Sequence, residues 1–328
     1  MYKGFYHLTR NPFEITPDPS FLFATKKHNE ALASLYYGVR RRKGFVVLTG
    51  EVGTGKTLLV RCLLALLNQA RVSYAYVFNP RLSPKEFLEY IAGDFGLPAT
   101  GKTKGELLLS LGTYLIGRHQ KNLTTVLVVD EAHYLSTELL EEIRLLTNLE
   151  TPQAKLLQIL LVGQPELDEK LDSTDLRQLK QRIALRSHLH PLTLDETAGY
   201  IYRRLQIAGH PTPAELLPME TIVEVHQQSR GYPRLINTLC ENALICGYAS
   251  RSQTITPEMI AEIAADFRLN VVRPSRAAQA GSEAHAAEVE RAARTLLELY
   301  ASLRKAQELE PDLRMTVAAG ARKHEPFI

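Results

Sequence analysis

Residues 50–57, which read GEVGTGKT, restrict the fold of this chain more than any other stretch. They match the pattern of a glycine, four variable residues and then Gly-Lys-Thr. The apolar run FVVLT precedes them and LLVRCLLALL follows, so a buried strand leads into the motif and a helix leads out of it. The bare pattern can arise by chance, but a match in strand–turn–helix context is rare. The sequence therefore predicts a turn that binds phosphate groups.

The residue types of this turn each have a chemical reason. Glycines at 50, 53 and 55 let several backbone N–H groups approach phosphate oxygens, and the positive end of the following helix adds to the attraction. We expect Lys56 to reach the β- and γ-phosphates of ATP, and the Thr57 hydroxyl to bind Mg²⁺. The predicted nucleotide contacts along the turn are Gly50, Glu51, Val52, Gly53, Thr54, Gly55, Lys56, Thr57 and Leu58.

An acidic pair, Asp130 and Glu131, follows the apolar run TVLVV further along the chain. The carboxyl end of a buried strand is where open α/β sheets bind ligands. We expect Asp130 to hold Mg²⁺ indirectly, through the groups that bind the metal. We expect Glu131 to polarise the water that attacks the phosphate. Such a pair alone is a weak signal. After a phosphate-binding turn it indicates ATP hydrolysis rather than a passive nucleotide switch.

Apolar runs without alternation are separated by helical runs throughout residues 26–192. The strand-like runs are FVVLT, SYAYVF, TVLVVD, KLLQILLVG and a short stretch around SHLHPL. This pattern predicts an α/β fold with a parallel sheet covered by helices on both faces. From about Thr193 the pattern is wholly helical, which predicts a small all-α lid over residues 193–270. Residues 1–25 form a lead-in rich in Pro and aromatic side chains, and residues 271–328 a linker, a short amphipathic helix and a disordered tail.

Composition and charge narrow the class of protein further. The net charge of +3 is near neutral for 328 residues, so a nucleic-acid partner would need a local basic patch. Three cysteines without paired metal spacing suit a reducing cytosol. The N-terminus does not resemble a secretory signal, and no apolar run approaches the roughly 18 residues of a membrane-spanning helix. We expect a cytoplasmic protein, attached to the inner membrane at most peripherally.

Several motifs in a fixed order extend the interpretation to a family. They are the lead-in NPF…TPDPSFLF, then KKHNEAL, GFVVLTGEVGTGKT, VVDEAH, LLVGQPEL, LKQRI and GYPRLIN. Over residues 5–266 they resemble the AAA+ ATPases of the ExeA type, which accompany type II secretion and mannose-sensitive pilus systems. The resemblance implies a P-loop AAA+ core, a helical lid and ATPase activity. Related ATPases of transposition and origin recognition share much of this core.

The resemblance also assigns roles to residues that the patterns leave open. Gln164, which ends the strand LLQILLVG, corresponds to the sensor-one residue that helps to orient the attacking water. Arg234, in the motif GYPR, corresponds to the sensor-two arginine that reaches from the lid to the γ-phosphate. Each position also has a plain structural interpretation, Gln164 as part of a strand-end turn and Arg234 as a surface arginine at a helix start.

A third implied role belongs to an arginine that acts on the nucleotide of the neighbouring subunit and stabilises transition-state charge. Three arginines near the end of the helix before the fifth strand are candidates, and Arg182 is preferred for its position before that strand: Arg177, Arg182 and Arg186. Lead-in residues near the adenine either help to cover it or only pack: Pro12, Phe13 and Ile15.

His133 follows the acidic pair. In helicases this histidine couples hydrolysis to the bound strand, whereas capping or packing is the simpler interpretation here.

Two functions fit an ATPase of this kind. The first is assistance to the assembly of an envelope machine (type II secretion, a pilus or exopolysaccharide export) through an envelope protein partner. ExeA-type proteins add a membrane-spanning segment and a peptidoglycan-binding domain that this sequence lacks, which favours the shorter pilus and exopolysaccharide relatives. The alternative is a DNA-associated regulator of the transposition or origin-recognition type, with the basic run 40–43 as its only local support. That run also suits the C-terminal end of a helix. A helicase would need a second RecA-like domain, and the chain has helices there instead.

The expected assembly is a homo-oligomer, either a ring or a filament, with nucleotides at the subunit interfaces. A short C-terminal helix is predicted from five residues on one seam, Val289, Ala293, Leu296, Tyr300 and Leu303. About two heptads are too short to be stable alone. We therefore expect this helix to dock on its own protein or on a partner.

Overall fold

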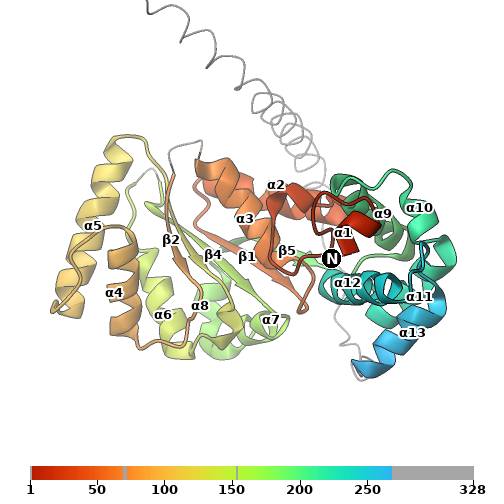
Figure 1. Ribbon diagram of the computed structural model, residues 1–328. Coiled ribbons are helices and arrows are strands. Elements are labelled where there is room, and N and C mark those ends of the chain that lie inside the picture. Colours follow the sequence, from red (N-terminus) through yellow and green to blue (C-terminus); the bar gives the residue numbers. More distant parts are fainter. Residues whose placement is uncertain (1, 69–71, 153, 268–328) are drawn as a thin grey trace, which may run out of the picture. The chain divides into compact units, whose positions relative to one another are not determined.

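Parallel strands form a central sheet in the computed structural model, which describes residues 2–68, 72–152 and 154–267 (Figure 1). Within those residues the sheet has five strands in the order β2-β3-β4-β1-β5. Their bounds are β1 Phe45–Gly50, β2 Ser73–Val77, β3 Thr125–Val129, β4 Leu157–Gly163 and β5 Ile183–Leu189. Every neighbouring pair runs parallel, for example β1 and β4 with Phe45 opposite Ile159. The predicted α/β fold with a parallel sheet is confirmed.

Helices cover both faces of this sheet, which explains why its strands are continuously apolar. Alternate residues of β1 point to opposite sides: Phe45 and Val47 join one buried cluster, while Val46 and Leu48 join another. The first cluster is completed by α4 (Pro84–Asp94), α5 (Lys104–Gln120), α6 (Thr137–Leu146), α7 (Glu166–Leu171) and α8 (Arg177–Lys180). The second is completed by α2 (Lys26–Arg40) and α3 (Lys56–Asn68).

A third buried cluster lies among the helices that follow the sheet in sequence (Figure 1). These lid helices are α9 (Leu194–Ile207), α10 (Pro213–Leu216), α11 (Met219–Ser229), α12 (Pro233–Ala249) and α13 (Pro257–Asp266). The lead-in, with α1 (Tyr2–Phe5) and the turn η1 (Pro19–Phe21), contributes Tyr2, Tyr6, Leu8 and Phe13 to the same cluster. The start of the chain thus packs with its last described helices. The division into a core 26–192 and a lid 193–270 stays a prediction.

Local sequence explains where several helices begin. Ser83, Thr103 and Thr193 cap the first turns of α4, α5 and α9, and in each case a glutamate three residues later returns a bond to the cap. These capping boxes satisfy backbone N–H groups that have no partner inside the helix. Thr25 caps α2 through its hydroxyl. Polar residues directly before apolar periodic runs therefore fix the helix starts.

The region before the fifth strand differs from its sequence prediction. The strand β5 begins at Ile183, four residues before the predicted stretch SHLHPL, and the helix expected around DLRQLKQRI is a 3₁₀ turn, η3 (Thr174–Leu176), followed by the short α8. The edge strand β5 gives a weak apolar signal, because it is only partly buried. Helix α7 was not predicted. The predicted C-terminal seam lies outside the described residues.

Among the described residues, none of the helices is both long and apolar enough to cross a lipid bilayer. The described residues all fall within one compact unit, Met1–Ala278.

Candidate functional site

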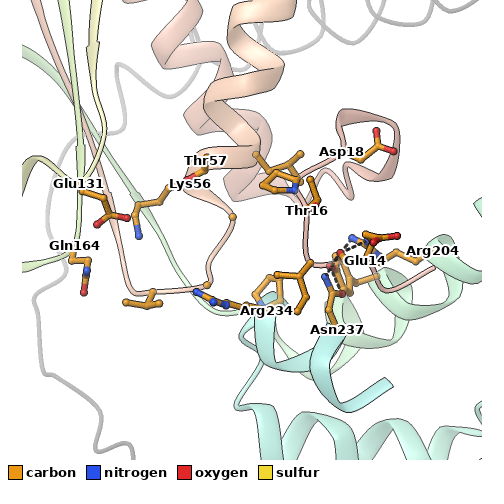
Figure 2. Close-up of a pocket in the computed structure, with 18 residues that line it drawn as sticks. Glu14, Thr16, Asp18, Lys56, Thr57, Glu131, Gln164, Arg204, Arg234 and Asn237 are labelled. Carbon is orange, nitrogen blue, oxygen red and sulfur yellow. Dashed lines mark hydrogen bonds between the residues drawn. The ribbon is translucent and has the colours of Figure 1, made fainter. Parts of the chain in front are cut away.

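A cavity of about 380 Å³ lies beyond the carboxyl ends of the strands, where the phosphate-binding turn, the lead-in and the lid helices meet (Figure 2). Its lining comes from all three parts of the chain: Glu14, Ile15, Thr16, Pro17, Asp18, Val52, Gly53, Gly55, Lys56, Thr57, Leu58, Glu131, Gln164, Tyr200, Arg204, Pro233, Arg234 and Asn237. Most of the predicted site residues are in this set. Gly50, Glu51, Thr54, Asp130 and Arg182 are not.

The turn between β1 and α3 has the backbone conformation that its glycines allow. Gly53 and Gly55 have φ values of +83° and +98°, which side chains other than glycine rarely adopt. A Cβ on Gly53 would come within 2.9 Å of the Arg234 Cβ, so the lid helix α12 approaches the turn closely here. The backbone N–H of Arg234 donates to the Gly53 carbonyl at 3.3 Å. Turn and lid are thus in direct contact.

The Lys56 side chain is buried beneath this turn. Its Nζ donates to the carbonyls of Gly50 at 2.7 Å and Glu51 at 3.0 Å. Burial lowers the pKa of Lys56, and the nearby carboxylates of Glu131 and Asp130 oppose that shift. A buried ammonium at the start of a 13-residue helix attracts an anion, and the neighbouring carboxylates partly offset this attraction.

His28 supports the turn from α2, although no sequence pattern gave it a role. Its Nε2 lies 3.2 Å from the Thr54 carbonyl and its Nδ1 lies 2.8 Å from the Thr25 hydroxyl. A carbonyl can only accept, so Nε2 carries the proton and Nδ1 accepts from Thr25. Burial lowers the pKa of His28, which favours this neutral form. The ring therefore holds one carbonyl of the turn in a fixed direction.

The Asp130 carboxylate, directly after β3, accepts hydrogen bonds from three donors. The Thr57 hydroxyl donates to Oδ2 at 3.2 Å, the Tyr76 hydroxyl donates to Oδ2 at 2.7 Å, and the Glu131 N–H donates to Oδ1 at 2.9 Å. Burial and the Asp130 charge raise the pKa of Tyr76, so its hydroxyl stays a donor. Tyr76 is a second residue that sequence patterns did not single out. Its only signal is its place on the strand next to β3.

Glu131 and Gln164 line the cavity from the ends of β3 and β4. Glu131 has the left-handed backbone conformation, with φ of 52°, and the short 3₁₀ turn η2 (Ala132–Tyr134) follows it. The Glu131 side chain is 44% exposed. In Figure 2 its carboxylate and the Lys56 ammonium lie close together on the sheet side of the cavity. A carboxylate that is open to the cavity can accept a proton there.

Buried polar groups form the opposite wall, on the lid helices. Arg204 of α9, which is 4% exposed, donates to the carbonyl of Pro12, to the carbonyl of Glu14 at 3.4 Å and to the Tyr200 hydroxyl at 2.9 Å. Asn237 of α12 accepts from Tyr200 at 2.7 Å and donates to the Glu14 carbonyl at 3.4 Å. These bonds tie the lead-in to the lid (Figure 2).

The lead-in is also tied to the sheet side. Arg61 of α3 donates to the Pro17 carbonyl at 2.8 Å. Residues 14–18 therefore cross the cavity between two anchors. Ile15 lines the cavity and is 63% exposed, whereas Phe13 is fully buried in the lid cluster. Of the lead-in residues considered for covering the adenine, Ile15 thus lines the cavity and Phe13 packs in the lid cluster.

The three candidate arginines are not among the residues that line the cavity, and they differ in their partners. Arg177 and Arg182 precede β5, whereas Arg186 lies within the strand and not near the end of a helix as predicted. Arg182 donates to the Arg144 carbonyl at 3.3 Å, to the Asn148 amide oxygen at 2.8 Å and to the Thr147 hydroxyl, all near the end of α6. Arg186 pairs with Asp168 at 3.2 Å. Arg177 is exposed and its side chain makes no hydrogen bond or ion pair with another described residue.

The donor set beside the turn suits Mg²⁺. Thr57 and Asp130 offer hard oxygens, and Mg²⁺ in nucleotide sites takes few protein ligands and completes its shell with phosphates and water. No cluster of three or more His, Cys, Asp or Glu residues that could hold a metal ion alone occurs in the described part of the chain. The site therefore fits a metal that arrives with a nucleotide.

Comparison with known proteins adds to this geometry. Residues 39–171 match the family model described as an AAA domain. General secretion pathway protein A of Aeromonas hydrophila is 43% identical over 256 residues, which cover 78% of this chain and 46% of that protein. The chain thus spans about half the length of this relative.

Solved structures share the fold at low sequence identity. The Aeropyrum pernix ORC2 protein, solved in ADPNP–ADP complexes, has a TM-score of 0.60 at 17% identity, over 80% of this chain and 75% of that chain. Drosophila ORC bound to DNA has a TM-score of 0.60 at 18% identity, over 93% of this chain and 83% of that chain. At these identities the likeness establishes the fold.

We predict that Arg204→Met lowers the free energy of unfolding by about 3 kcal/mol, because it leaves buried carbonyls of the lead-in without a donor. It also weakens nucleotide binding, because residues 14–18 lose an anchor. Urea unfolding and calorimetric titration with an ATP analogue measure the two effects. The matched control is Arg203→Met on the exposed side of the same helix, with an expected change within about 0.5 kcal/mol. Equal stabilities of the two variants would contradict this role of Arg204.

Proposed function

The chain belongs to the AAA+ ATPases and is related to general secretion pathway protein A, and from this premise we propose that it binds ATP with Mg²⁺ and hydrolyses it in the cavity. The observation that carries the proposal is the convergence of the phosphate-binding turn, the strand-end carboxylate of Glu131 and a lid arginine on one cavity, with Asp130 bonded to Thr57 of the turn. The AAA+ fold implies nucleotide binding, and family membership implies ATP hydrolysis. The residue roles below are our proposal.

In this proposal the turn and Lys56 hold the phosphates. The backbone N–H groups of residues 53–57 and the start of α3 face the anion, and Lys56 exchanges its bonds to the Gly50 and Glu51 carbonyls for phosphate oxygens. Thr57 and Asp130 would hold Mg²⁺, which when bound neutralises charge on the phosphate oxygens. Tyr76 keeps the Asp130 carboxylate in place.

Glu131 takes the role of general base. It accepts a proton from the attacking water as that oxygen bonds to the γ-phosphorus, and the bond from the γ-phosphorus to the bridging β-oxygen breaks, giving ADP and phosphate. Gln164 at the end of β4 orients the water. Arg234 extends from the start of α12 beside Gly53 and reaches the γ-phosphate from the lid side, so lid position and phosphate state are linked (Figure 2).

We further propose a homo-oligomer in which an arginine of one subunit completes the nucleotide site of the next. Arg182 was preferred by its position in the sequence, but its guanidinium is held by three groups near the end of α6. Arg177 is exposed and makes no bond to a described residue, so it can reach a neighbour without breaking contacts. We therefore propose Arg177 for this role.

We propose that the protein uses ATP hydrolysis to assist the assembly of an envelope machine at the inner membrane. The support is the 43% identity to a protein named for the general secretion pathway. The alternative, a DNA-associated ATPase, has one supporting observation: Arg40, Arg41 and Lys43 are exposed together. Arg42 instead donates to Asn122 at 3.2 Å and connects α2 to the end of α5.

Lys56→Ala is predicted to abolish nucleotide binding, because it removes the ammonium that lies under the turn. Glu131→Gln is predicted to keep binding, to lower the hydrolysis rate by at least 100-fold, and to favour the oligomer by trapping ATP. Calorimetry, phosphate release and analytical ultracentrifugation measure these effects. Hydrolysis by the Glu131→Gln protein at the wild-type rate would show that the base is misassigned.

Mixing experiments identify the arginine that acts on the neighbouring subunit. Arg177→Ala and Lys56→Ala are each expected to be inactive, whereas a mixture of the two regains activity, because some interfaces combine an intact turn with an intact Arg177. Arg182→Ala is expected to lower the melting temperature while the remaining folded protein hydrolyses ATP. If only the Arg182→Ala protein is inactive and complemented, our sequence-based preference was right and the proposal for Arg177 is wrong.

DNA binding is tested separately by fluorescence anisotropy with a labelled duplex at low salt, with and without ATP. We expect no ATP-dependent binding. Binding that weakens steeply with salt, and that is lost when Arg40, Arg41 and Lys43 are changed to Ser, would favour the DNA-associated alternative.

A further inference from the structure

The turn after Glu131 lies between two residues that line the cavity, Glu131 and Gln164. Glu131 is a non-glycine residue in the left-handed conformation, which costs about 1 kcal/mol or more and persists only when its surroundings fix it. The following turn, η2, lies against the end of β4, where a Cβ on Gly163 would come within 3.2 Å of the His133 nitrogen. Gln164 is the next residue after Gly163. Two strand ends are thus joined at His133.

The His133 ring lies between the side chains of Glu131 and Gln164. Its Nε2 is 2.9 Å from the Gln164 Nε2, and its Nδ1 is 3.5 Å from the Glu131 Oε2. The side chain is only 7% exposed, and burial lowers the pKa of His133, so the ring is neutral near pH 7. Lys170 of α7 donates to the His133 carbonyl at 2.6 Å and fixes the backbone of the turn.

The protonation state of this ring follows from its partners. The Gln164 backbone N–H donates to Nδ1 at 3.4 Å, so Nδ1 of the neutral imidazole is an acceptor. The ring proton then lies on Nε2, next to the end of the Gln164 side chain, whose amide can turn its oxygen toward the ring and accept it. The ring thus holds Gln164 through both its backbone and its side chain, and the Glu131 carboxylate lies beside it.

His133 does not line the cavity, although both of its partners do. It therefore acts through them and touches no substrate. We propose that His133 is a positioning residue that holds Gln164 beside the Glu131 carboxylate, so that the residue that orients the water keeps its place next to the base. The proposal rests on the proposed hydrolysis of ATP, and one of its tests does not depend on turnover.

A packing role is the competing explanation, because the His133 ring also contacts the Tyr134 ring at a centroid distance of 4.1 Å. The two explanations predict different effects of His133→Phe. Phenylalanine keeps an aromatic ring of similar size in the turn but has neither donor nor acceptor. Asparagine and glutamine lose the ring but keep polar atoms that can bridge the two partners.

The first test is steady-state ATP hydrolysis by the full chain. We expect His133→Phe to lower kcat by about 10- to 100-fold, the range for a displaced catalytic group, with the KM for ATP and the melting temperature nearly unchanged. His133→Asn or His133→Gln recovers part of kcat. Gln164→Leu lowers kcat as well, and the double variant His133→Phe/Gln164→Leu loses no more than the worse single variant. The matched control, Tyr134→Phe, keeps the wild-type kcat.

Wild-type kcat in the His133→Phe protein, or independent effects that multiply in the double variant, would overturn the proposal. The second test is nitrogen NMR of the chain labelled at its histidine ring nitrogens, with the His133 signals identified by their loss in His133→Phe. We expect a neutral ring with its proton on Nε2, and a change of the Nε2 signal in Gln164→Leu.

A proton on Nδ1, or a charged ring at pH 7, overturns these contacts whether or not the protein hydrolyses ATP. If the wild type shows the expected Nε2 tautomer but binds no ATP, the proposed function fails while the contact geometry stands. The two failures are therefore distinguishable.

Discussion

The Asp130 carboxylate is the interaction on which the site depends. It lies directly after the strand β3 and accepts hydrogen bonds from the Thr57 hydroxyl of the phosphate-binding turn, the Tyr76 hydroxyl of β2 and the backbone N–H of Glu131, the next residue. A buried carboxylate is stable only when donors satisfy it. Its burial therefore holds the turn and Glu131 at fixed positions. The parallel sheet makes this possible, because parallel strands bring their carboxyl ends to one edge.

The lead-in gives the cavity its second constraint. It is held by Arg61 from the sheet side and by Arg204 and Asn237 from the lid side, while its aromatic residues are buried among the lid helices. Any movement of the lid relative to the turn changes the path of residues 14–18 across the cavity. The contact of Arg234 with Gly53 couples the same two parts at the phosphate end. A nucleotide that binds both ends would thus select one lid position.

The sequence alone was sufficient for the parallel sheet and for the backbone conformation of the turn after β1, because strand burial and glycine spacing are local signals. It was insufficient for residues whose partners are distant in the chain. Tyr76 and Asp130 are 54 residues apart, and Arg204 is 192 residues from Pro12. No local pattern marks such pairs. His133 could be recognised as part of a motif, but its position between Glu131 and Gln164 depends on the neighbouring placement of β3 and β4.

The central claim is that one cavity carries out the phosphate chemistry. The most direct measurement is a crystal structure of the Glu131→Gln protein with ATP and Mn²⁺, in which the metal is located by its anomalous signal. The account predicts a metal at about 2.1 Å from the Thr57 hydroxyl, next to Asp130. It also predicts the phosphates along residues 53–57 and the adenine ring beside residues 14–18. A metal or nucleotide bound elsewhere, with Thr57 and Asp130 still bonded to each other, would contradict the account.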